Sequence, residues 1–304
     1  MTPKPIIQLI LGILVFFVIP SSGVCQVPTS HKPGLVTSSL FEKIPDATET
    51  EDSTMALLEK GDRHFENMRF DEAQKLYQQA LKAGRHQDLI LVRLGDIYIR
   101  RGNFRKAGES FQEALSINPE NKFALVGLAD VLNEDDLRTE AMKLLEQALK
   151  IDPGLAVAYT TIGDIYLDQG RHSQALKAFN KSLELLPNQP YPDTYIGLGE
   201  YYSSLGDMNK SYHYFKTAHR IDPGDPDPYI GMFYYYRSAG EKEKAEAILR
   251  KCIKKLPGSI EAATVLIQYL WGTGKKQEAL NLLDDYSRLY PRNRDIKKMQ
   301  NYMK

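Results

Sequence analysis

The stretch that decides the fold is Leu91–Pro119, LVRLGDIYIRRGNFRKAGESFQEALSINP. Apolar or small residues recur in it at i, i+3, i+4 and i+7, in one block before Gly102 and a second block after it. This spacing places the apolar residues on one face of a helix. Gly102 is a turn signal, and Pro119 ends the second block. The stretch therefore predicts a hairpin of two short helices.

The hairpin pattern recurs along the chain. Prolines stand at 119, 153, 187, 223, 257 and 291, so that every gap is 34 residues except one gap of 36. Small residues follow the same spacing with the same single insertion, at Ala73, Ala107, Ala141, Ala175, Ser211, Ala245 and Ala279. A third series has Gly61, Gly95, Ala129, Gly163 and Gly199. Three series that share one insertion indicate an array of repeats.

The small residues have a packing reason. Two helices approach to about 8 Å only where the side chains at their crossing are small. We expect Gly95 and Ala107 to meet at this crossing, with Tyr98 and Phe111 filling the space beside it. Neither face of one hairpin is buried alone, so each hairpin stacks on the next.

The pattern resembles the tetratricopeptide repeat, whose 34-residue signature has a bulky residue, Leu-Gly, Tyr, Ala, Phe, Ala and Pro. The second unit matches it with Leu91, Leu94, Gly95, Tyr98, Ala107, Phe111, Ala114 and Pro119, and the fourth with Tyr159, Gly163, Tyr166, Ala175, Phe179, Ser182 and Pro187. The resemblance implies an all-α, right-handed α-solenoid of about seven helical hairpins with a C-terminal capping helix.

We expect the following organisation of the chain. Residues 1–25 form a signal peptide or anchor, 26–53 a flexible linker and 292–304 the capping helix. The seven units are 54–87, 88–121, 122–155, 156–191, 192–225, 226–259 and 260–291. Phe233 and Ile267 replace the crossing glycine in the last two units, so their helices are expected to lie further apart. Prolines 187, 190 and 192 surround the insertion and predict a looser joint.

The N-terminus carries a targeting signal. Residues 6–19, IIQLILGILVFFVI, form an uncharged run of fourteen. A secretory signal needs about 7–15 apolar residues before a small-residue cleavage site, and a membrane span needs about 20. The length favours a cleaved signal peptide, and the protein is expected to be exported to the periplasm, envelope or exterior. Two alternatives are an uncleaved anchor and a lipoprotein attached through Cys25, although Val24 departs from the lipoprotein pattern.

Composition limits the functional classes. The net charge is +0 over 304 residues, which gives no reason to expect a nucleic-acid partner. The chain contains no HExxH, GxSxG, GxxxxGK[ST] or GxGxxG motif, and its six histidines are scattered. Cys25 and Cys252 make no disulfide framework, and Cys252 is expected to be a small core residue. We expect a protein that is not an enzyme, with no catalytic residue, metal or cofactor.

Binding is the remaining function. Stacked hairpins create a concave surface, and in the tetratricopeptide family the first helix of each hairpin lines it. The resemblance assigns to this groove Asp62, Phe65, Val92, Asp96, Ile99, Val126, Asp130, Asn133, Asp164, Leu167, Glu200, Tyr234, Arg237 and Trp271. An apolar floor with carboxylates suits a protein or peptide segment that has apolar and basic residues, bound as an extended strand or a helix. Tyr234, Arg237 and Trp271 are expected to be the exposed members.

Two functions follow as hypotheses. The first is an exported, non-enzymatic scaffold that binds a partner segment in its groove. The second is a surface- or polymer-binding module that uses the basic C-terminal end, since residues 251–304 hold eleven Lys/Arg and five Asp/Glu, a local charge of +6. Membrane contact would occur only through an uncleaved N-terminus or a lipidated Cys25.

Overall fold

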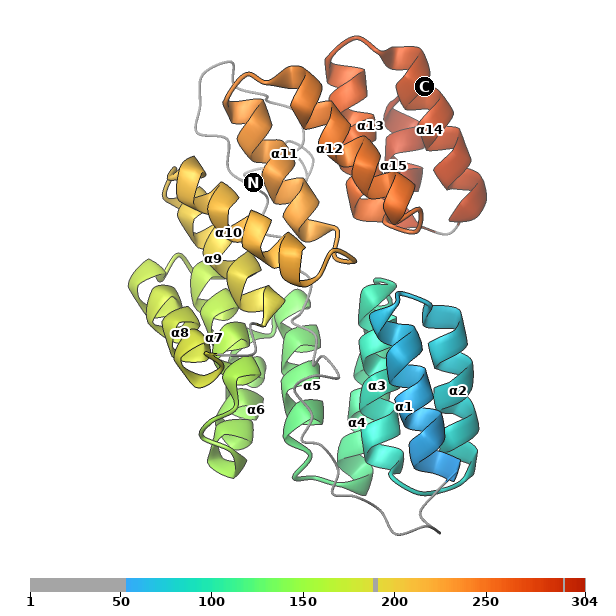
Figure 1. Ribbon diagram of the computed structural model, residues 1–304, viewed down its shortest axis with the longest axis vertical. Helices are drawn as coiled ribbons and strands as arrows, with labels where there is room; N and C mark the ends of the chain where they lie inside the picture. The colour runs from blue at the N-terminus through green and yellow to red at the C-terminus, as the bar shows by residue number, and fades with distance from the viewer. Residues whose placement is uncertain (1–52, 188–190, 292, 304) are drawn as a thin grey trace, which may run out of the picture.

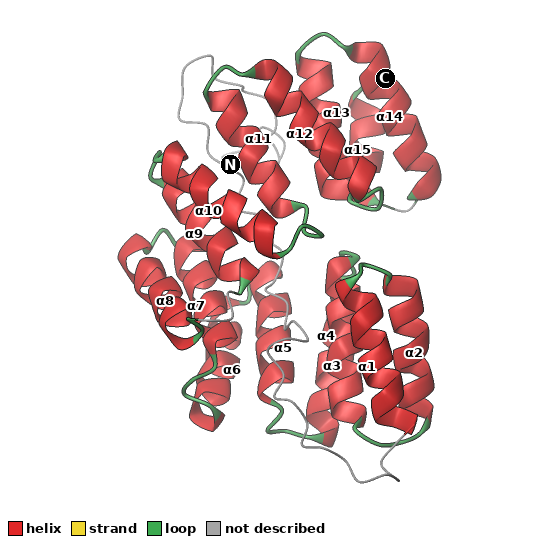
Figure 2. Ribbon diagram, viewed as in Figure 1, coloured by secondary structure: helices red, strands yellow, loops and turns green. Residues whose placement is uncertain are grey.

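The computed structural model describes residues 53–187, 191–291 and 293–303. Within these ranges the chain forms fifteen helices and no strand (Figure 2). The helices are α1 (Ser53–Glu66), α2 (Phe70–Lys82), α3 (Gln87–Arg100), α4 (Phe104–Ile117), α5 (Lys122–Glu134), α6 (Arg138–Ile151), α7 (Ala156–Asp168), α8 (His172–Leu185), α9 (Pro192–Ser204), α10 (Met208–Ile221), α11 (Asp227–Ser238), α12 (Lys242–Lys255), α13 (Ile260–Gly272), α14 (Lys276–Leu289) and α15 (Arg294–Tyr302).

The helices pair into seven antiparallel hairpins, α1–α2 to α13–α14, and α15 packs on the last one. The hairpins follow one another along a curved path (Figure 1). The first helices of successive hairpins contact one another; for example, α3 contacts α5, and α5 contacts α7. The closely spaced first helices therefore lie on the inside of the curve. The expected α-solenoid of about seven hairpins with a capping helix is confirmed.

A left-handed backbone turn ends the first helix of every hairpin. Glycine occupies this turn in five hairpins, with φ of 66° at Gly102 and 87° at Gly274 as the extremes. Asp136 and Met68 occupy the equivalent place in the third and first hairpins, with φ of 67° and 60°. Only glycine adopts this conformation without steric cost, which explains why the turn glycines recur with the repeat period.

Aromatic rings join three of the hairpins to the hairpin that follows. A Cβ on Gly95 would lie 2.5 Å from the ring of Phe111, and a Cβ on Gly127 of the following hairpin would lie equally close to it. The ring is thus held between two glycines, one from each hairpin. Ala107 was the expected neighbour of Gly95, but the nearest atoms belong to Phe111. Two further rings repeat the arrangement, Phe179 between Gly163 and Gly197, and Phe215 between Gly199 and Gly231.

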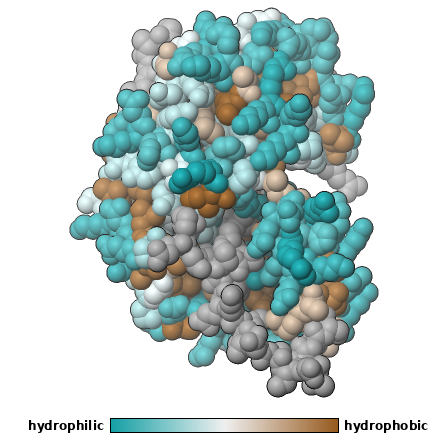
Figure 3. Space-filling view, in the orientation of Figure 1, coloured by the Kyte–Doolittle hydropathy of each residue, from teal (hydrophilic) through white to brown (hydrophobic). Residues whose placement is uncertain are grey.

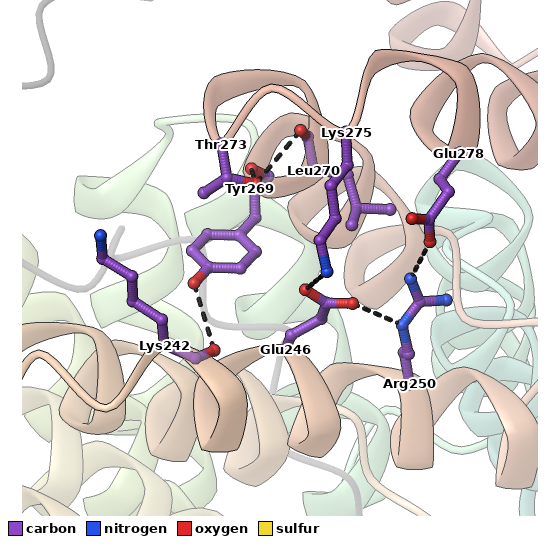
Figure 4. A network of polar contacts seen from close by, with 8 residues as sticks. All are labelled: Lys242, Glu246, Arg250, Tyr269, Leu270, Thr273, Lys275 and Glu278. Atoms are coloured by element: carbon purple, nitrogen blue, oxygen red, sulfur yellow. Dashed lines mark hydrogen bonds and ion pairs between the residues drawn. The ribbon is translucent and has the colours of Figure 1, made fainter.

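The last two hairpins differ as their sequences suggest. Phe233 and Ile267 are fully buried, and the two helices of each hairpin approach each other along less of their length than those of earlier hairpins. Polar side chains add to the junction between α12 and the seventh hairpin (Figure 4). Glu246 accepts hydrogen bonds from Lys275 (2.7 Å) and Arg250 (2.8 Å), and Arg250 also pairs with Glu278 (2.5 Å).

The capping helix and the lone described cysteine behave as ordinary core elements. Ile296 and Met299 of α15 are buried against the seventh hairpin, where Tyr286 replaces the small residue of earlier units. Tyr286 also donates a hydrogen bond to the carbonyl oxygen of Pro257 (3.0 Å). Cys252 is a buried core residue, as predicted.

The array curls back on itself. Arg100, at the end of α3, donates hydrogen bonds to Asp222 (2.6 Å) and Asp225 (3.0 Å), which lie between α10 and α11. Met68 of the first hairpin reaches Gly224 in the same loop. We call the contact of Arg100 with Asp222 and Asp225 the clasp. It ties the second hairpin to the start of the sixth.

Some predictions concern residues outside the described ranges. The signal peptide, the alternative of Cys25 lipidation and most of the linker lie outside the described residues, as does part of the predicted joint at 187–192. Within the described ranges, no helix is both long enough and apolar enough to cross a bilayer.

Candidate functional site: the inner face

The inner face is built from one stripe of each first helix. Residues three before, one after and four after the crossing glycine position lie along it, because i, i+4 and i+7 spacing returns to the same side of a helix. In hairpins two to five this stripe has the residues Val92, Asp96, Ile99, Val126, Asp130, Asn133, Thr160, Asp164, Leu167, Ile196, Glu200 and Ser203. All of them are buried except Asn133, which is half-buried.

Apolar residues of the first four hairpins form a floor on the inner face. Phe65, Val92, Ile99, Val126 and Leu167 are all buried. Between the fourth and fifth hairpins three buried hydroxyl groups interrupt this floor. The hydroxyl oxygen of Thr160 lies 2.7 Å from that of Thr194 and 3.0 Å from that of Ser182. Each hydroxyl has hydrogen-bond partners inside the group, so these buried polar atoms need no charged partner.

Asp62 joins the first two hairpins. Its carboxylate accepts hydrogen bonds from Arg93 of α3 (2.8 and 3.2 Å) and from the hydroxyl of Tyr77 in α2 (2.5 Å). The arginine side chain is 6% exposed and the aspartate side chain 22% exposed. Burial, together with the Asp62 carboxylate, raises the pKa of Tyr77, so this phenol stays a hydrogen-bond donor.

Asp96 is the most unusual group on the face. It is 2% exposed, and its Oδ2 has no hydrogen-bond partner among the described residues. Burial raises the pKa of Asp96 to about 8, although Arg93 and Arg100 oppose the rise. The nearby carboxylates of Asp62 and Asp193 act in the same direction as burial. Burial thus favours the protonated form of this carboxyl group.

The remaining acidic positions are equally buried. Asp130 is 2% exposed, and Asp164 and Glu200 are each 6% exposed. Asn133 lies on the rim beyond Asp130 and donates a hydrogen bond to Asp168 of the next hairpin (3.3 Å). The acidic series is thus buried in hairpins two to five.

The C-terminal part of the face is more open. Arg237 and Trp271 are half-buried, and Lys276 stands 5.2 Å from the Trp271 ring. Tyr234 differs from its expected exposure, because it packs edge-on against Phe233 at 5.0 Å and is buried. A bulky Phe233 in place of the crossing glycine brings this packing about.

Sequence reasoning missed four residues of the face. Arg93 lies three residues before Asp96, and Arg100 lies four residues after it. Residues at these spacings are neighbours on a helix, so the sequence did contain a signal that both arginines lie near Asp96. Asp193 and Tyr191 begin the fifth hairpin and are also buried. Burial and the Asp193 carboxylate raise the pKa of Tyr191. They stand where the fourth hairpin has Leu155 and Val157, so the repeat pattern predicts apolar residues there.

On the side shown in Figure 3 the surface is mainly hydrophilic, with hydrophobic residues in separate groups. In the described part of the chain, no group of three His, Cys, Asp or Glu side chains is arranged to hold a metal ion. The inner face is therefore the candidate site for recognition.

Family models match most of the solenoid. Residues 47–187 match the cilia and flagella-associated protein 70 middle TPR-like domain, and residues 192–225 and 229–259 each match a tetratricopeptide repeat. No match was found among curated proteins.

Solved structures share the fold at low sequence identity. A tetratricopeptide repeat protein from Parabacteroides merdae is 20% identical, with a TM-score of 0.52 over 83% of this chain and 98% of that one. PilW, described as a widely conserved type IV pilus biogenesis factor, is 19% identical, with a TM-score of 0.50 over 71% and 99%. A chain of the APC/C hetero-tetramer Cut9–Hcn1 is 15% identical, with a TM-score of 0.55 over 84% and 57%.

Proposed function

We propose that this chain, which carries tetratricopeptide repeats, is an exported, non-enzymatic scaffold that holds a partner segment along its inner face. The observation that carries the proposal is the inner face itself. Equivalent positions of successive hairpins there supply apolar residues and a series of carboxylates. Such a surface recognises apolar anchors and Lys or Arg side chains spaced along one extended segment.

The acidic residues restrict the partner. A segment ending in a carboxylate would place negative charge beside Asp130 and Asp164, and burial strengthens that repulsion because the surroundings have a low dielectric constant. A basic and apolar segment gains both salt bridges and apolar contact. The segment is therefore expected to bind through its side chains and not through a free C-terminal carboxylate.

Export rests on the apolar run at residues 6–19. PilW has the same fold and belongs to pilus biogenesis, but at 19% identity this likeness supports the fold alone. The second hypothesis, a basic C-terminal binding surface, gains no support from the geometry. Lys275, Arg288 and Lys298 each pair with a carboxylate of the same region, which lowers the charge available to a polyanion.

Photo-cross-linking in cells tests the proposal. A photoreactive p-benzoylphenylalanine replaces Asn133, on the inner rim, in one variant and Glu113, on the outer helix α4, in the control. The inner position is expected to cross-link to another protein and the outer position is not. Capture that is equal from both positions, or found only from the outer one, overturns the proposal.

A further inference from the structure

The outer helices of two neighbouring hairpins are strongly basic. Helix α10 contains three Lys or Arg residues and no Asp or Glu, a net charge of +3. Helix α12 contains six Lys or Arg residues and two Glu, a net charge of +4. In the other five outer helices, α2, α4, α6, α8 and α14, the numbers of basic and acidic residues differ by at most one. Positive charge on the outer helices is therefore concentrated in the fifth and sixth hairpins.

Five exposed cations stand near the C-terminal ends of these two helices. They are Lys216 and Arg220 of α10 and Lys251, Lys254 and Lys255 of α12, and we call them the basic patch. In the part of the chain that the structure describes, no hydrogen bond or ion pair engages their side chains. The helix dipole favours a cation in the last turn, but it acts on all seven outer helices alike. It does not explain why the charge gathers on two of them.

The two helix ends lie side by side, as the histidine His219 of α10 shows. Burial lowers the pKa of His219, and the charges of Lys251 and Lys255 from α12 lower it further. A charge shifts the pKa of another group appreciably only from close by. Asp222 acts on His219 in the opposite direction, but Arg100 already binds this carboxylate in the clasp. The cations of α10 and α12 therefore belong to one area of the surface.

The composition of the basic patch distinguishes between kinds of anionic partner. Four of its five members are lysines. Lysine is depleted in protein–protein interfaces, where aromatic residues and arginine provide the anchors. Clusters of about four to eight Lys or Arg residues are instead typical of proteins that bind anionic lipid, because many weak attractions add up at a charged surface. The apolar run at residues 6–19 is also expected to direct the chain to a membrane.

We propose that the basic patch binds the surface of a bilayer that contains anionic phospholipid. Membrane contact was expected only through the N-terminus, so the patch is a second and separate means of contact. It lies on the outer helices, and the proposal is therefore independent of the proposed function, which uses the inner face. The C-terminal cations Lys275, Arg288 and Lys298, which pair with carboxylates, take no part in it.

Sedimentation with vesicles tests the proposal. The full-length protein is mixed with vesicles of phosphatidylcholine, which are neutral, or with vesicles in which phosphatidylglycerol replaces part of it. We expect more binding to the anionic vesicles, because the apolar N-terminal run contacts both kinds and the basic patch only the anionic kind. The excess should fall steeply between about 0.1 and about 1 M salt, since the screening length shortens from ~10 to ~3 Å.

Two variants that lose the same charge locate the contact. The patch variant carries Lys216→Gln, Lys251→Gln and Lys254→Gln. The control variant carries Lys143→Gln, Lys150→Gln and Lys177→Gln, which change exposed lysines of the outer helices α6 and α8. One lysine at an anionic surface increases partitioning about fivefold, so the patch variant should lose about 100-fold in partition coefficient and the control variant much less. Circular dichroism establishes that both variants fold.

Acetylation of lysines identifies the face that meets the vesicle. The native chain is labelled with acetic anhydride, with and without anionic vesicles, and the labelled positions are determined by mass spectrometry. Vesicles are expected to protect Lys216, Lys251, Lys254 and Lys255 and to leave Lys143 and Lys177 reactive.

The opposite results overturn the proposal. Equal binding to neutral and anionic vesicles would show that the N-terminal run alone makes the contact. An unchanged partition coefficient for the patch variant, or protection confined to lysines of α6 and α8, would place the contact elsewhere. Binding to soluble polyglutamate without binding to anionic vesicles would assign the patch to an acidic protein segment. Partner capture at the inner face is a separate measurement, so the scaffold function stands or falls apart from this inference.

Discussion

At the scale of the residue, the buried acid Asp96 gives the inner face a measurable pH dependence. Burial raises its pKa to about 8, whereas an unfolded aspartate titrates near ~3.9. Between these values the folded state binds a proton that the unfolded state has lost. The free energy of unfolding therefore falls as the pH rises through this window. The contribution of Asp96 is favourable at the acidic side and is lost near pH 8.

The substitution Asp96→Asn removes this dependence, because an amide of the same shape does not titrate. We expect the free energy of unfolding of the native chain, relative to the variant, to be greater at pH 5 than at pH 8.5. Urea denaturation of both proteins at both pH values measures the difference. If the native chain and the variant differ in free energy of unfolding by the same amount at pH 5 and pH 8.5, the pKa of Asp96 is not raised.

The repeat spacing predicts the stripe of the helix on which Asp96 lies, but not the side chains around it. Its position follows from the spacing to Gly95, which local periodicity determines. Its burial and its neighbour Asp193 depend on a hairpin about 100 residues further along the chain. A repeat pattern contains no information about such contacts, since it describes one unit and its neighbour.

At the scale of the element, the joint between hairpins depends on a ring held by two glycines. The first glycine, Gly95, belongs to the repeat signature and was predicted to lie at a helix crossing. The second, Gly127, was missed, because Thr161 occupies the equivalent place in the fourth hairpin and interrupts the series. The geometry around Phe111 shows why both positions are small.

The substitution Gly127→Ala tests this joint. Its Cβ would lie 2.5 Å from the Phe111 ring, so that the ring must shift within a packed interior. Overpacking of this kind costs about 1–3 kcal/mol. Gly108→Ala is the matched control, since its Cβ would meet Val131 at an acceptable 3.4 Å. Thermal and urea unfolding should show destabilisation for Gly127→Ala alone; equal effects of the two substitutions would contradict the account.

At the scale of the whole molecule, the clasp fixes the curl of the array. The side chains of Arg100 and Asp225 are only 9% and 8% exposed. They connect the second hairpin to the loop between the fifth and sixth, which are not neighbours along the chain. The family resemblance predicted a curved solenoid, and this was correct. How far it curls depends on small rotations summed over several hairpins, which the repeat signature does not specify.

Removing the arginine should open the molecule. Arg100→Ala leaves Asp225 buried without its cation, which costs about 3 kcal/mol, and it frees the α10–α11 loop from α3. We expect lower stability and a larger radius of gyration by small-angle X-ray scattering. Arg105→Ala is the control, because its pair with Glu109 is exposed and surface pairs contribute little. An unchanged radius for Arg100→Ala would mean that the clasp does not hold the curl.

The most direct test of the central claim is partner capture by a chain whose inner face has lost charge but kept its shape. Asp130→Asn/Asp164→Asn changes two inner carboxylates, and Glu113→Gln/Glu146→Gln changes two exposed ones on the outer helices α4 and α6. Both variants are cross-linked in cells after circular dichroism has established that they fold, and the captured proteins are identified by mass spectrometry. The account predicts that the inner variant loses the partner and the outer variant keeps it. An inner variant that captures the same partner in the same amount as the native chain would contradict it.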